Sequence, residues 1–173
     1  MKSNKVLEGV KTRAGWLIIL LLIIVAAWYI SAFHYQLMMI QGESMSPSFH
    51  HMQMVILDKD VEGHTYGDVI AFRCENLNVI LVKRIAACPG DTVQISDGIL
   101  LVNGVTSEIY GQEALFKYAG IAEEAVMLGD NQYFVIGDNV AESKDSRYEE
   151  IGIIYIKNII GEIMTRDKKQ GAR

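Results

Sequence analysis

Several features are scarce in this sequence of 173 residues. It has two cysteines, two prolines and four histidines, and it has no internal repeat and no low-complexity tract. It also has no basic stripe to neutralise phosphates, which argues against a nucleic acid partner. A chain of this length without repeats provides one compact domain plus an appendage.

Charge is also missing from one long stretch. From Ala14 to Gly42 there is no Asp, Glu, Lys or Arg, and most of the residues are apolar. About 20 such residues form a helix that crosses about 30 Å of hydrocarbon, with aromatic rings near its ends. We therefore predict a transmembrane anchor over residues 14–35. A cleavable signal peptide and a buried helix are the alternatives, but small residue pairs lie inside the apolar run rather than after it.

The charges on either side of this stretch predict its orientation. Residues 1–13 carry four basic residues and one acid, a net charge of +3, whereas the whole chain carries −5 and the remainder therefore −8. Basic flanks stay in the cytoplasm. We predict a cytoplasmic N-terminus over residues 1–13, an extracytoplasmic domain over residues 36–165 and a frayed polar tail over residues 166–173. This arrangement makes a single-pass protein of the cell membrane, with the lipid bilayer as a partner.

The two cysteines are predicted to be free thiols. The segments 68–74 and 79–86 flank a polar turn and indicate a hairpin. In that register Cys74 faces Val79, and Cys88 lies roughly 30 Å further along at about 3.3 Å per residue. A disulfide needs Cα atoms within about 7 Å.

Short apolar segments separated by turn residues indicate a mostly β fold of short antiparallel strands. Residues 108–128 are less periodic and predict a loop with a short helical piece. The expected strands are residues 35–40, 55–57, 69–72, 79–82, 93–95, 99–102, 133–136 and 159–163.

Three polar segments interrupt this pattern. They are Gly42–Ser48 (GESMSPS), Lys83–Asp91 (KRIAACPGD) and Gly137–Arg147 (GDNVAESKDSR). Each by itself is ordinary turn chemistry, and a lysine that ends an apolar strand can extend to water. The four histidines match none of these segments and lack the spacing of metal ligands, so we expect no metal site and no cofactor.

Together, in this order, the three segments resemble the sequence boxes of the bacterial type I signal peptidases, which are serine–lysine proteases. That family shows Ser-Met-x-Pro-Thr, Lys-Arg-x-x-x-x-Pro-Gly-Asp and Gly-Asp-Asn-x-x-x-Ser-x-Asp-Ser-Arg. The segment Gly67–Phe72 is similar to its remaining Gly-Asp-hydrophobic box. Ser48 and Phe49 depart from the usual Thr and Leu but keep a hydroxyl and an apolar side chain. The short gap between the last two boxes resembles the compact Gram-positive form.

The resemblance implies a role for five residues. Ser44 would be the nucleophile and Lys83 the general base, a role that lysine performs only when burial lowers its pKa. Ser143 would hydrogen-bond the Lys83 amine, and Asp145 and Arg147 would pair as support for the site. The amide of Ser44 would donate to the oxyanion. Gram-negative relatives add a serine hydroxyl two residues earlier, where this chain has glycine.

The resemblance also implies a substrate. The fold would be a signal-peptidase-type β domain after one transmembrane helix, and it would remove signal peptides from exported preproteins after Ala-x-Ala. Met45, Leu81 and Val82 would bind the peptide, which would add as a strand. The secretion translocon is a further expected partner.

Three other interpretations fit the sequence less well. A self-cleaving repressor would share the serine–lysine chemistry but would carry a DNA-binding domain instead of an apolar span. A non-enzymatic member of the same fold group would have little reason to keep Ser44, Lys83 and Ser143. A histidine-dependent signal peptidase would carry histidine where this chain has Lys83.

Overall fold

The computed structural model describes residues 2–61, 63–111 and 115–165, with side chains in the first helix described from Gly15 to Ile30 and at Phe33. The chain forms two units, residues 1–36 and 37–173. The expected polar tail, residues 166–173, lies outside the described residues.

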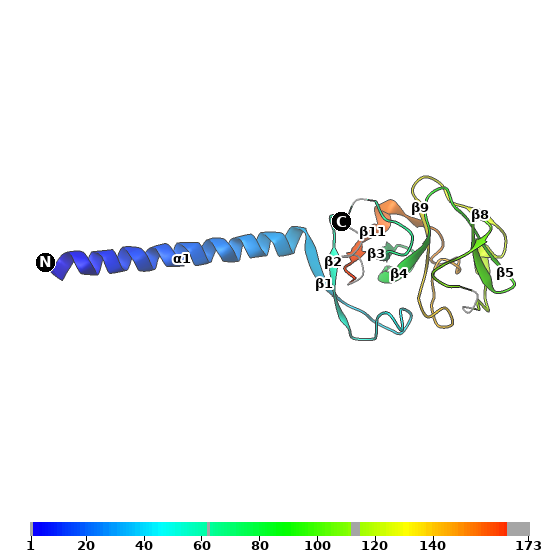
Figure 1. Cartoon of the computed structure of the whole chain (residues 1–173), viewed down its shortest axis with the longest axis horizontal. Coiled ribbons are helices and arrows are strands. Elements are labelled where there is room, and N and C mark those ends of the chain that lie inside the picture. The colour runs from blue at the N-terminus through cyan, green and yellow to red at the C-terminus, as the bar shows by residue number, and fades with distance from the viewer. Residues whose placement is uncertain (1, 62, 112–114, 166–173) are drawn as a thin grey trace. The chain divides into compact units, whose positions relative to one another are not determined.

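A single helix, α1 (Lys2–Phe33), makes up most of the first unit (Figure 1). It begins earlier than the predicted anchor, within the basic segment, and its apolar residues from Trp16 to Ile30 are exposed on every side. Among the side chains that are described, no helical stretch reaches the length and apolarity that a membrane crossing requires.

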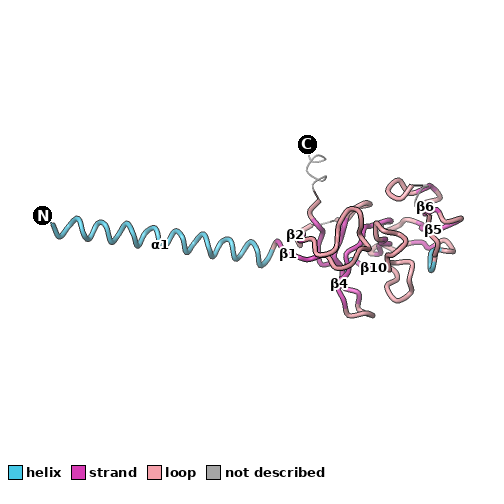
Figure 2. Tube along the Cα trace, turned by 90° about the horizontal axis from the view of Figure 1, so that it is seen from below, coloured by secondary structure: helices cyan, strands magenta, loops and turns pink. Residues whose placement is uncertain are grey.

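The second unit is built from two antiparallel β-sheets, and short 3₁₀ turns occur at Gly120–Ala122 and Ile156–Asn158. The larger sheet has the strand order β1-β2-β11-β3-β4-β9-β10, and the smaller has the order β7-β6-β5-β8. Figure 2 shows β5 and β6 together on one side of this unit, away from β2 and β4. The strand bounds are β1 (Tyr35–Met39), β2 (Met54–Asp58), β3 (Val69–Cys74), β4 (Val79–Ala87), β5 (Thr92–Ser96), β6 (Ile99–Val102), β7 (Val105–Thr106), β8 (Val126–Met127), β9 (Gln132–Ile136), β10 (Ile154–Tyr155) and β11 (Ile159–Ile163).

The mostly β prediction is confirmed, and so is the hairpin of β3 and β4, in which Cys74 pairs with Val79. Both cysteines are free thiols, as predicted. The short helical piece expected within residues 108–128 is the 3₁₀ turn at Gly120–Ala122. The two-residue strands β7, β8 and β10 were not predicted, because two residues are too few to show a period.

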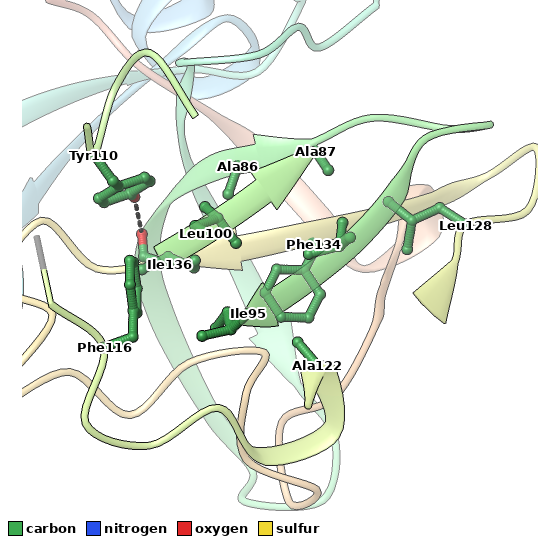
Figure 3. Close-up of a cluster of buried hydrophobic side chains, with 11 residues drawn as sticks. Ala86, Ala87, Ile95, Leu100, Tyr110, Phe116, Ala122, Leu128, Phe134 and Ile136 are labelled. Atoms are coloured by element: carbon green, nitrogen blue, oxygen red, sulfur yellow. Dashed lines mark hydrogen bonds between the residues drawn. The ribbon is translucent and has the colours of Figure 1, made fainter. Parts of the chain in front are cut away.

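A hydrophobic core joins the two sheets (Figure 3). Ala87 and Phe134 from the larger sheet meet Ile95 and Leu100 from the smaller, and all four are almost completely buried. Two further clusters cover the two faces of the larger sheet, one around Val69, Ala71 and Leu57 and the other around Phe72 and Ile85. The larger sheet is therefore packed on both faces, which holds β4 rigidly between β3 and β9.

Candidate active site

The loop that carries Ser44 is closed at its base. It connects β1 to β2, and backbone hydrogen bonds link Ile40 to Gln53 and Met52 at 2.9 Å. Inside this loop the Gly42 amide donates to His51 Nδ1 at 3.0 Å. Met45 anchors the loop in the cluster around Val69 and is only 1% exposed. The serine is thus held on a short, fixed segment rather than on a free tip.

Lys83 lies in β4 opposite Ile70 of β3 and is 3% exposed. Its Nζ donates to Ser44 Oγ at 2.6 Å, so the two residues predicted to react lie in direct contact. Burial lowers the pKa of Lys83 from 10.5 to about 8, and the positive charge of Arg147 acts in the same direction. The carboxylates of Asp145 and Asp138 oppose this shift only in part. At pH 7 about one-tenth of such amines are neutral and able to accept a proton.

Asp145 and Arg147 form a buried ion pair beside this amine. Arg147 Nε donates to Asp145 Oδ1 at 2.7 Å, and neither side chain is more than 2% exposed. Asp145 Oδ2 also accepts the Gly137 amide at 3.1 Å. The Arg147 guanidinium donates at 3.0 Å to the carbonyls of Val140 and Ser143. The predicted pair therefore fixes the backbone of the third polar segment.

Ser143 lies in this segment, but the hydrogen bond expected between it and the lysine amine is absent. Its Oγ is buried and has no hydrogen-bond partner among the described residues. The Lys83 amine donates to Ser44 Oγ instead. A Cβ on Gly137 would overlap both Ser143 Oγ and the Ser44 carbonyl. Glycine at this position is what allows the two serines to approach each other.

The proposed substrate-binding residues divide between the two faces of the larger sheet. Val82 packs against the cluster that contains Met45, whereas Leu81 packs against the cluster around Phe72. Neighbouring residues of a strand point to opposite faces, so this division follows from their positions. Leu81 and Met45 therefore do not line the same pocket.

Two residues that position the site were not predicted from the sequence. Asn139 donates from its backbone to the Ser44 carbonyl at 3.1 Å and from its side chain to the Glu43 carbonyl at 3.3 Å. Asp138 accepts two hydrogen bonds from Arg84, at 2.7 and 2.6 Å. Both stand in the Gly-Asp-Asn motif, which marked their importance but not their partners.

Comparison with known proteins identifies the family. Residues 13–166 match the profile described as signal peptidase, peptidase S26. The chain belongs to the signal peptidase family. Signal peptidase I of Bacillus licheniformis is 31% identical over 170 residues, which cover 92% of this chain and 87% of that protein. Signal peptidase I S of Bacillus subtilis is 28% identical over 172 residues, covering 93% of this chain and 91% of the relative.

A solved structure of a signal peptidase I from Enterococcus faecalis also matches. It is 26% identical with a TM-score of 0.48, and the match covers 61% of this chain and 100% of the other. The match to the family profile agrees with the resemblance that the three polar segments indicated. The interpretations as a repressor or a non-enzymatic protein are not favoured.

The low pKa of Lys83 predicts a cost in stability that depends on pH. A pKa of about 8 in the folded protein, against 10.5 for the free group, lowers stability by about 3 kcal/mol below pH 8. This loss is recovered as pH rises from 8 towards 10.5, because the unfolded state then binds more protons. We expect Lys83→Met to raise the Tm at pH 7 and the gain to shrink above pH 8. Thermal melts from pH 6 to 10 measure this.

The matched control is Lys144→Met, which removes a lysine whose side chain is 69% exposed. This control should show no comparable gain in Tm at any pH. A Lys83→Met protein less stable than the wild type across the whole range would contradict the assignment of a desolvated amine.

Proposed function

We propose that this chain is a serine endopeptidase that removes signal peptides from exported preproteins, with Ser44 as nucleophile and Lys83 as general base. One observation carries the proposal: the Lys83 amine is buried, has a pKa of about 8 and lies 2.6 Å from Ser44 Oγ. The family match supports the substrate class, because the Bacillus relatives described above are named signal peptidase I and signal peptidase I S.

The chemistry begins with the neutral amine. Lys83 Nζ accepts the proton of the Ser44 hydroxyl as Oγ attacks the scissile carbonyl carbon. The resulting ammonium then gives its proton to the leaving amine as the peptide C–N bond breaks. In the second half of the reaction Lys83 Nζ takes a proton from the water that attacks the acyl carbon, and it returns a proton to Ser44 Oγ as the ester C–O bond breaks and the acid product leaves. The hydrogen bond that joins Nζ to Oγ serves both directions of transfer.

The remaining residues position this pair and stabilise charge. The amide of Ser44 donates to the oxyanion, a contribution worth about 10²–10³ in rate in other enzymes. The Asp145–Arg147 pair and Ser143 support the segment that faces the amine. Ser143 Oγ, which is buried and has no hydrogen-bond partner among the described residues, is the group that we assign to orient the amine.

The substrate adds as an extended strand beside β4, where Val82 and Met45 share one cluster and Leu81 belongs to the other. Met45 is almost completely buried, and we infer that the pockets beside it are shallow and accept small side chains, as cleavage after Ala-x-Ala requires. A substrate cleaved after Ala-x-Ala has one small residue directly before the cut and a second small residue two positions earlier.

We further propose that residues 14–35 anchor the chain in the cell membrane with residues 1–13 in the cytoplasm. The support is the uncharged stretch that starts at Ala14, the net charge of +3 before it, and the exposed apolar side chains from Trp16 to Ile30. This topology brings the active site to the outer surface, where signal peptides emerge.

Topology is tested with a protease added to intact spheroplasts. We expect digestion of residues 37–165 and protection of an epitope tag fused to residue 1, because the basic flank stays inside. The control is the same digestion after lysis, which should remove the tag. Protection of residues 37–165 in intact spheroplasts would contradict the proposed orientation.

The dyad is tested by incubating the detergent-solubilised full chain with a preprotein and mapping the cut by mass spectrometry. Ser44→Ala and Lys83→Ala should each lower kcat by several orders of magnitude, because nucleophile and base act as a unit. The matched controls are Ser46→Ala, which alters a half-buried serine of the same loop, and Lys144→Ala, which alters an exposed lysine; both should cleave normally. More than a few per cent of wild-type activity in Lys83→Ala would exclude lysine as the base.

A further inference from the structure

A sharp turn at Gly42 leads into the residue proposed as the nucleophile. Gly42 has a φ of +85°, a backbone conformation that residues with a side chain rarely adopt. Among the described residues, a Cβ on Gly42 would meet nothing within 4 Å beyond its chain neighbours. Glycine is therefore needed here for the turn itself and not to make room for another group. Ser44 follows two residues later, so the turn sets the direction from which it enters the active site.

The side chain of His51 holds this turn in place. Its Nδ1 accepts the Gly42 amide at 3.0 Å. A ring nitrogen accepts a hydrogen bond only when it carries no hydrogen, so this bond requires the neutral ring with its hydrogen on Nε2. In return, the backbone amide of His51 donates to the Glu43 carboxylate. Two hydrogen bonds in opposite directions therefore join His51 to the two residues that precede Ser44.

Asn139 supports the same segment from another side. It donates to the Glu43 carbonyl at 3.3 Å and to the Ser44 carbonyl at 3.1 Å. The peptide group between Glu43 and Ser44 is planar, so its carbonyl and the Ser44 N–H point in opposite directions. The bond from Asn139 fixes one point of this plane, and the bonds between His51 and residues 42 and 43 fix the chain that enters it. The direction of the Ser44 N–H, the proposed oxyanion donor, depends on both.

We propose that His51 is a positioning residue for Ser44 and acts by holding the turn at Gly42. This inference rests on the proposed function. His51 acts through the backbone and not as an acid or base, because its ring bonds the Gly42 amide while Lys83 bonds Ser44 Oγ at 2.6 Å. Loss of the ring bond would loosen the Ser44 amide and hydroxyl relative to the scissile carbonyl, which matters most in the transition state. The expected signature is a lower kcat at an unchanged KM.

The test measures kcat and KM of full-chain variants in detergent micelles, with a peptide that carries an Ala-x-Ala site. The assays run at pH 9, where the Lys83 amine and histidine rings are neutral in most molecules. His51→Leu has no acceptor on its side chain, and we expect it to lower kcat about tenfold, the scale of one lost hydrogen bond. His51→Asn should restore kcat to within about twofold of the wild type, because its Oδ1 is attached to Cγ as Nδ1 is in histidine. KM should stay unchanged in both variants.

The matched control is His50→Leu, the same substitution at the neighbouring exposed histidine. The ring of His50 has its Nδ1 3.4 Å from Ser46 Oγ, away from the turn at Gly42, so kcat should equal that of the wild type. Hydrogen exchange of the Gly42 amide, followed by NMR on the same proteins, reports the bond without reference to activity. Exchange should be faster in His51→Leu than in the wild type, and His51→Asn should restore protection.

The outcomes separate this inference from the proposed function. A wild type that cleaves no such peptide overturns the proposed function, whereas a wild type that cleaves with the same kcat as His51→Leu overturns the role of His51 alone. A His51→Asn protein as slow as His51→Leu also overturns it, because the ring would then matter for something other than its acceptor. A higher KM at unchanged kcat would mean that the ring contacts the substrate. Equal loss in His50→Leu would mean that the effect is not specific to the bond at Gly42, and each of these two results contradicts the proposal.

Discussion

The buried amine of Lys83 is the feature on which the rest of the active site depends. A lysine in contact with water is almost fully protonated at neutral pH and cannot accept a proton from serine. Here the side chain extends from the centre of a sheet that is packed on both faces, and burial brings its pKa to about 8. Burying the ammonium form costs free energy, and the same burial keeps the Lys83 amine neutral in a fraction of the molecules at pH 7.

The charged side chains around the Lys83 amine do not cancel the lowering of its pKa. Asp145 would raise the pKa of Lys83 further if it stood alone, but it is paired with Arg147 at 2.7 Å. Asp138 is held in the same way by Arg84. Asp145 also accepts the backbone amides of Gly137 and Arg147, whereas Asp138 joins this segment to Arg84 of β4. Because Gly137 has no side chain, this segment can pack directly against the loop that carries Ser44.

The sequence was sufficient to predict the β architecture, the β3–β4 hairpin and the free thiols. It also pointed to Ser44 and Lys83, whose Oγ and Nζ atoms lie 2.6 Å apart. Alternation and turn residues carry that information locally, and the three polar segments carry the family resemblance. The contacts that position Ser44 could not be predicted. The bonds from Asn139 to Glu43 and Ser44 join residues far apart in sequence, and their geometry depends on how β9 ends. The expected bond from Ser143 to Lys83 failed for the same reason, because local sequence does not determine which of two serines an amine meets.

The most direct test of this account is the dependence of kcat/KM on pH for a peptide with an Ala-x-Ala site. Only the neutral amine is active, so log kcat/KM should rise with unit slope and level off above a single ionisation at about 8. Lys144→Met, which removes an exposed lysine, should give the same profile. A profile that is flat from pH 5 to 10, or that has its ionisation near about 6.5 as for histidine, would contradict the assignment of Lys83 as the base.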